Sequence, residues 1–175
     1  MSEYEFELRF SVPSCDEDTD QLIERLGEAG CDDALIGVGR RGQVALDFTR
    51  EAESALKAVL SAIADVRRAL PEARLVEVSP DLVGVTDVGQ LLSVSRQNVR
   101  KLLLDCEALP PAALHEGRPA LWHLATVLEW LGANKHYRIP ERLSSLAWAA
   151  MQVNLIVSSR EVDRETQRDV LALLR

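Results

Sequence analysis

The first half of the chain alternates between segments with strand-like and helix-like hydrophobic periods. Residues 4–12 place an apolar side chain at every second position, which is typical of a strand with one buried face. Residues 34–38 and 44–48 repeat this pattern around the turn 39–42, so they predict a β-hairpin. Helical spacing appears in residues 19–29, which end before Gly30, and in residues 54–70, which end before Pro71. Val76 and Val78 indicate a last short strand.

The predicted element order is therefore strand, helix, strand, strand, helix, strand. This order is the split β-α-β arrangement of ferredoxin-like domains, with one packed and one open sheet face. In the helix of residues 54–70 we expect a buried stripe of Leu56, Val59, Leu60, Ile63, Val66 and Leu70. We predict an α+β fold that begins with an acidic ferredoxin-like βαββαβ domain in residues 1–82.

Residues 85–104 predict two short helices that meet at a tight turn. Thr86 and Ser95 belong to the residue types favoured at helix N-caps. The side chains expected to face inward are Val88, Leu91 and Leu92 in the first helix and Val99, Leu102 and Leu103 in the second. The outward positions at the start of the second helix are Arg96, Gln97, Asn98, Arg100 and Lys101. Arg pairs with guanine edges, Asn and Gln pair with adenine edges, and Lys contacts phosphate, so this helix is predicted to enter a major groove.

Residues 85–131 resemble the winged helix-turn-helix of the MerR and phage excisionase type. The resemblance rests on Thr86 through Val99 and on a following wing, residues 113–122, with Arg118 at its tip. It implies that Arg118 approaches the DNA backbone or minor groove, beside a site formed by Ser95, Arg96, Gln97, Asn98, Arg100 and Lys101. The chain departs from the family pattern in three places, having Gly89 where alanine is usual, Ser93 where glycine is usual, and His123 where a cation often follows the wing tryptophan.

Residues 140–157 predict a helix that must be buried, because apolar residues lie on most of its sides and Gln152 and Asn154 are the main interruptions. The winged helix of residues 83–134 offers too little surface to cover it. We therefore predict that it packs against its equivalent in a second chain and makes a two-fold homodimer. Packing on its own domain is the alternative. Residues 135–175 are thus assigned to C-terminal helices, of which the last, residues 161–175, is more polar.

Net charge confines any contact with DNA to the second half of the chain. The total of −8 is divided into −9 for residues 1–82, −1 for residues 83–134 and +2 for residues 135–175. Nucleic-acid binding draws on Lys and Arg that replace condensed counterions, which an acidic half cannot supply. We predict a sequence-specific DNA-binding transcriptional regulator that acts as a dimer. A winged helix used only for protein contact is the alternative for the same residues.

Catalysis is not indicated by any motif in the chain. The three histidines form no Glu-x-x-His pair and no serine–histidine–aspartate arrangement, and no glycine-rich phosphate loop is present. Cys15, Cys31 and Cys106 are odd in number and far apart, so they are expected to be free thiols. We expect no enzyme activity, no metal and no cofactor. No apolar run approaches the roughly 18 residues of a membrane span, and Met1–Glu5 does not resemble a signal peptide, so a cytoplasmic protein is expected.

A second function class remains open for residues 1–82. Their acidic strand, from Glu3 to Arg9, is suited to a basic protein partner. The chain would then be an antitoxin-like or adaptor protein in which DNA binding is secondary or absent. An effector-binding domain is a further possibility for the same residues, but the glycine-rich turn that would support it is missing after the first strand.

Overall fold

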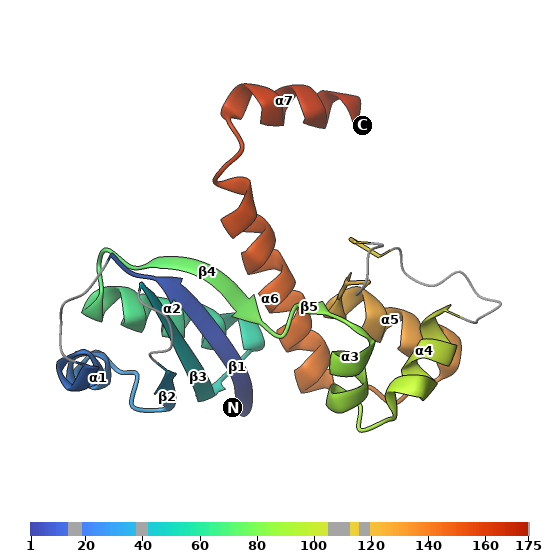
Figure 1. Cartoon of the computed structure of the whole chain (residues 1–175), viewed down its shortest axis with the longest axis horizontal. Coiled ribbons are helices and arrows are strands. Elements are labelled where there is room, and N and C mark those ends of the chain that lie inside the picture. The colour runs from blue at the N-terminus through green and yellow to red at the C-terminus, as the bar shows by residue number, and fades with distance from the viewer. Residues whose placement is uncertain (14–18, 38–41, 105–112, 116–119, 175) are drawn as a thin grey trace.

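The computed structural model describes residues 1–13, 19–37, 42–104, 113–115 and 120–174, which form two lobes and a projecting arm (Figure 1). We call residues 1–79 the sheet lobe and residues 82–137 the helical lobe. The sheet lobe contains β1 (Ser2–Ser11), α1 (Thr19–Glu28), β2 (Ala34–Gly37), β3 (Gln43–Ala52), α2 (Ala55–Ala69) and β4 (Arg74–Ser79). The helical lobe contains β5 (Leu82–Val83), α3 (Val85–Leu91), α4 (Arg96–Leu104), β6 (Trp122–His123) and α5 (Leu124–Lys135). They are followed by α6 (Glu141–Ser159) and α7 (Arg164–Leu173).

The sheet has the strand order β2-β3-β1-β4, and every neighbouring pair is antiparallel. The period-two pattern of residues 4–12 correctly predicted which face is buried. Tyr4, Phe6, Leu8 and Phe10 lie in the core, whereas Glu3 and Glu5 are exposed on the open face. Phe6 stacks on Phe48 across the β1–β3 pair, with ring centroids 5.4 Å apart. The turn predicted between the hairpin strands lies largely outside the described residues.

Helix α2 buries part of the stripe that its larger side chains predict. Val59, Val66 and Leu70 are buried as expected, and Ile63 packs against the core, but Leu56 and Leu60 are exposed. Their places on the core side of the helix are taken by Ala55, Ala58, Ala62 and Ala69, which the prediction overlooked because it ranked positions by size. Small alanine side chains allow α2 to approach the sheet and α6 closely, and this packing outweighs the larger transfer energy of a leucine side chain. Ser54 is the N-cap of α2, since its Oγ accepts a hydrogen bond from the Lys57 amide.

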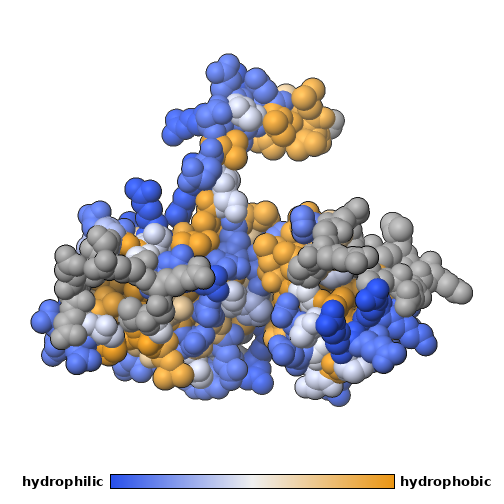
Figure 2. Space-filling model, in the orientation of Figure 1, coloured by the Kyte–Doolittle hydropathy of each residue, from blue (hydrophilic) through white to orange (hydrophobic). Residues whose placement is uncertain are grey.

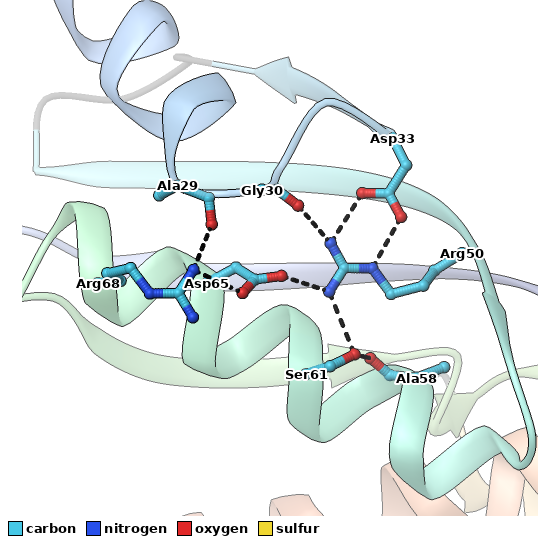
Figure 3. Close-up of polar contacts among 8 residues, drawn as sticks. All are labelled: Ala29, Gly30, Asp33, Arg50, Ala58, Ser61, Asp65 and Arg68. Carbon is cyan, nitrogen blue, oxygen red and sulfur yellow. Dashed lines mark hydrogen bonds and ion pairs between the residues drawn. The ribbon is translucent and has the colours of Figure 1, made fainter.

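A buried arginine joins the strands of the sheet lobe to its helices (Figure 3). The side chain of Arg50, on β3, is 9% exposed. Its guanidinium donates to Gly30 O, Asp33 Oδ1 and Oδ2, Ser61 Oγ and Asp65 Oδ2 at 2.7 to 3.2 Å. These hydrogen bonds, chiefly those to Asp33, hold the pKa of the guanidinium above its ordinary value despite burial. Arg50 therefore connects the end of α1, the loop before β2 and the middle of α2.

Cys31 lies beside this network and is a free thiol, as the sequence predicted for it. Burial, and secondarily the Asp65 carboxylate, raises the pKa of Cys31 to about 11. The thiol is therefore protonated and unreactive near neutral pH. Cys15 and Cys106, for which the same prediction was made, lie outside the described residues.

Helix α6 lies between the two lobes and is covered by both of them. Leu146, Ala149, Ala150 and Val153 join the core of the sheet lobe. Ala147 and Met151 join the core of the helical lobe. The argument for burial against a second chain assumed that only the winged helix was available, and this assumption is wrong, because the sheet lobe supplies the missing surface. The burial of α6 therefore gives no support for a dimer through residues 140–157.

A polar joint connects the lobes beside α6. Asp81 is 2% exposed, and its carboxylate accepts from Asn154 Nδ2 at 2.7 Å and lies 2.6 Å from His123 Nδ1. Asn154 also exchanges two hydrogen bonds of 2.8 Å with the backbone of Val78 on β4. The joint thus links β4, β6 and α6.

Among the described residues, no helix combines the length and hydropathy that a membrane span requires.

Candidate nucleic-acid interface

The interface candidate is built on α3 and α4, which pack against each other as two short helices joined by residues 92–95. Val99 and Leu103 are fully buried and anchor α4 in the core of the helical lobe. Ser95 caps α4 as predicted, since its Oγ accepts from the Asn98 amide at 3.2 Å. Thr86 is not an N-cap. Helix α3 begins one residue earlier, and the Asp87 carboxylate accepts the Gly84 amide at 2.7 Å. Leu91, predicted to face inward, is exposed.

The turn between α3 and α4 explains two of the departures from the family pattern. Ser93 adopts φ +55°, the left-handed conformation for which glycine is the usual residue. Directly after Ser93, the Val94 amide donates to Gly89 O at 2.8 Å. A Cβ on residue 89 would lie only 2.8 Å from the Val94 carbonyl oxygen. Gly89 is therefore required by the close approach of this turn, even though alanine is usual in the family.

Gly89→Ala is expected to destabilise the helical lobe by about 1 to 3 kcal/mol, because the contacting atom belongs to the backbone and the turn must shift to admit the methyl group. Urea denaturation measures the effect. Gly132→Ala in α5 is the matched control, since the nearest atoms to its added Cβ are 4.0 Å away. The control should be neutral or stabilising. Equal stability of the Gly89→Ala variant and the unchanged chain would contradict the prediction.

All five side chains predicted to face outward on α4 are exposed, namely Arg96, Gln97, Asn98, Arg100 and Lys101. Arg96 and Arg100 are one helical turn apart, and so are Gln97 and Lys101, so these four side chains form two adjacent rows. The helix contains no acidic residue. The surface of the helical lobe in this region is largely hydrophilic (Figure 2).

The predicted wing is described only at its base. Leu121 O accepts from the Leu114 amide at 2.9 Å, and the Leu121 amide donates to His115 O at 3.1 Å, so the two arms are paired. Trp122, at the end of the second arm, is buried in the core. Arg118, the expected tip contact, lies outside the described residues. His123, which replaces the usual cation, faces Asp81 in the joint.

The structure adds a segment that the sequence interpretation missed. Asn98 Nδ2 on α4 lies 3.4 Å from the hydroxyl of Tyr137, in the loop between α5 and α6. This contact brings residues 135–138, with Lys135 and the exposed Arg138, beside the start of α4. The run Lys135-His136-Tyr137-Arg138 was the available sequence signal. It was assigned to the C-terminal helices, because Tyr137 lies 39 positions after Asn98 and no local pattern relates two residues at that separation.

No protein-family model matches the chain, and neither the curated proteins nor the solved structures contain a significant match to it.

Proposed function

We propose that this protein binds double-stranded DNA in a sequence-specific manner and regulates transcription, with α4 entering the major groove. The finer architecture that we propose is a ferredoxin-like sheet lobe joined to a winged helix-turn-helix. The observation that carries the proposal is α4 itself, a capped and well-anchored helix whose exposed side chains are all cationic or amide-bearing along residues 96–101. Buried Val99 and Leu103 hold the helix so that this surface faces outward.

Each exposed side chain of α4 has a role in this proposal. Arg96 and Arg100 contact guanine edges, and Gln97 contacts adenine, because these pairings are bidentate. Lys101 contacts the phosphate backbone, and so do the first amides of α4 behind Ser95. Asn98 is assigned to base contact as well, and its contact with Tyr137 links the α5–α6 loop to the same surface.

Selection from random duplexes by gel shift tests the proposal. The full chain should enrich one sequence at low salt, and its affinity should fall steeply as salt increases, because phosphate contacts release counterions. Failure to enrich any sequence at low salt would reject sequence-specific binding.

Arg96→Ala is expected to cost about 1 to 3 kcal/mol of binding free energy and to relax the preference at one base pair. Lys101→Ala should weaken all sequences alike and reduce the salt slope by about one, because it removes a phosphate contact. Fluorescence anisotropy over a salt series measures both effects. Arg67→Ala, which removes an exposed arginine of α2, is the matched control and should bind like the unchanged chain. Equal losses for Arg96→Ala and Arg67→Ala would place the interface elsewhere.

A second candidate function is an adaptor role of the acidic sheet face, in an antitoxin-like protein. The observation that favours it is that Glu3, Glu5 and Asp47 remain exposed on the open face of the sheet. These carboxylates line a cleft of about 960 Å³ that continues to Leu91 and Leu143 of the neighbouring elements. A basic protein segment is the partner that such a surface would bind.

Affinity capture with two baits tests the adaptor role. A cellular protein retained by the unchanged chain and lost with Glu3→Lys/Glu5→Lys would support it. Proteins retained equally by both baits would exclude a role for the acidic face.

A further inference from the structure

The arm, which we define as residues 155–174, leaves an apolar surface uncovered. Helix α6 extends beyond its last core residue, Val153, and α7 turns away from both lobes (Figure 1). None of the ten residues of α7, all of them described, is buried. The large apolar side chains exposed along the arm are Leu155, Ile156, Val162, Val170, Leu171, Leu173 and Leu174. Apolar atoms gather at the far end of α7 (Figure 2).

Helix α7 has the features of a helix that packs against protein. Val170, Leu171 and Leu174 follow the i, i+1, i+4 spacing that places side chains on one stripe. Asp163 caps the helix by accepting the amides of Glu165 and Thr166. Even with this cap, ten residues are fewer than the roughly 12 to 15 that an isolated helix needs in water, so α7 requires tertiary contacts.

A bed of three apolar side chains lies beside α6 at the edge of the lobes. Val76 on β4, Leu82 on β5 and Leu155, at the root of the arm, are each about half exposed. They line one hollow of about 310 Å³, whose other lining residues are polar, namely Glu77, Asp81, His123, Asn154 and Ser158. The α7 helix of the same chain stands away from β4 and β5 (Figure 1). One chain thus carries both an unpaired apolar helix and an unfilled apolar bed.

Charge and size favour a second copy of this chain as the occupant. The polar side of α7 carries Arg164 and Arg168 together with Glu165 and Asp169, so it is neutral and lacks the cationic face of helices that bind anionic lipid. The hollow is also lined by Glu77 and Asp81, so its acidic groups suit the arginines of α7 from a second copy. The arm comprises 20 residues, and a stable interface uses about 20 to 30 residues on each side.

We propose that two copies associate around a two-fold axis by exchanging their arms, with the α7 stripe of each copy packed into the Val76–Leu82–Leu155 bed of the other. Both contacts are equivalent by symmetry. The proposal goes beyond DNA binding, and it also supplies the second copy that a weakly basic interface needs. The bed is formed by β4, β5 and α6, and the arm by the end of α6 and by α7, so neither includes a residue of α4.

Sedimentation velocity of the full chain without DNA tests the exchange. The unchanged chain should sediment as a dimer of its 19.4 kDa subunit. Leu171→Glu in the arm and Leu82→Glu in the bed should each raise the dissociation constant at least about tenfold, because each buries a charge in both contacts. Leu60→Glu is the matched control, since Leu60 is 51% exposed on α2 and Leu171 is 54% exposed on α7. The control should remain dimeric.

An equimolar mixture of the two variants distinguishes arm exchange from other dimers. A heterodimer of Leu171→Glu and Leu82→Glu chains retains one unchanged arm in one unchanged bed, so the mixture should recover dimer that neither variant forms alone. A monomeric unchanged chain would overturn the proposal, as would a dimer that survives Leu171→Glu. Loss of dimer with Leu171→Glu but not with Leu82→Glu would show pairing of α7 with α7 and would also overturn it. Because no DNA is present, these outcomes are independent of the DNA-binding test.

Discussion

Replacing Arg50 by alanine is expected to lower the free energy of unfolding by about 3 to 5 kcal/mol. The guanidinium is buried and joins Asp33 and Asp65, both at 2.7 Å, to the carbonyl of Gly30. Alanine would leave two carboxylates of the sheet lobe without their shared cation and would also lose the contact of the guanidinium with the Phe48 ring, 4.8 Å from its centroid. Because Asp33 and Asp65 retain some contact with solvent, we expect the loss of unfolding free energy to lie near the lower end of this range.

Chemical denaturation followed by circular dichroism measures this loss. Arg9→Ala is the matched control on the same sheet, because Arg9 pairs with Glu7 and Glu77 but its side chain is 42% exposed. Exposed ion pairs contribute about 1 kcal/mol or less, so the control should be nearly neutral. Arg50→Lys should fall between the two, since an ammonium keeps the charge but cannot reproduce the two parallel bonds to Asp33. Similar losses for Arg50→Ala and Arg9→Ala would show that the buried network contributes little.

The Arg50 network also shows where sequence-based prediction ends. The β1 and β3 strands were predictable because period-two alternation directly reports a half-buried sheet. Arg50 occupies an alternate, inward position of β3, which the hydrophobic pattern treats as a polar interruption. Its partners lie 11 to 20 residues away in sequence, and only the packing of α1 and α2 on the sheet brings them together.

The candidate interface likewise has one part that the sequence predicted and one part that it did not. Exposed side chains on α4 were predictable, because Val99 and Leu103 define the buried side of a short helix and the remaining positions follow from its geometry. Ser93 was noted at the turn because a left-handed residue is needed there. The contact between Asn98 and Tyr137 was not predictable, since a left-handed residue, His136, ends α5 and redirects the chain towards α4.

For helix α6 the local inference of burial was correct, but the surface of the same chain that covers it was missed. Its apolar character on several sides correctly indicated burial, but a one-dimensional pattern does not identify the surface that covers a helix. The same limitation applies to Asn154, which was interpreted as an interruption of the apolar helix. In the folded chain its amide reaches β4, 76 residues earlier, and the buried Asp81.

Asn154→Ala is consequently expected to cost about 2 to 4 kcal/mol, because the variant leaves the Val78 amide and carbonyl and one Asp81 oxygen without their hydrogen-bond partner. Asn134→Ala is the matched control, since the Asn134 side chain is exposed on α5 and bonds only to the backbone of its own helix at Trp130. The control should change stability by less than about 0.5 kcal/mol. Thermal unfolding measured by calorimetry compares the two variants.

The joint predicts a change in cooperativity as well as in stability. Asp81, His123 and Asn154 connect the sheet lobe, the helical lobe and α6 through polar contacts, whereas the apolar side chains of α6 are divided between the two cores. Weakening the joint should therefore separate the unfolding of the lobes and broaden the calorimetric transition, so that the van't Hoff enthalpy falls below the calorimetric enthalpy. A single sharp transition in Asn154→Ala, at the temperature of the unchanged chain, would show that packing of α6 alone couples the lobes.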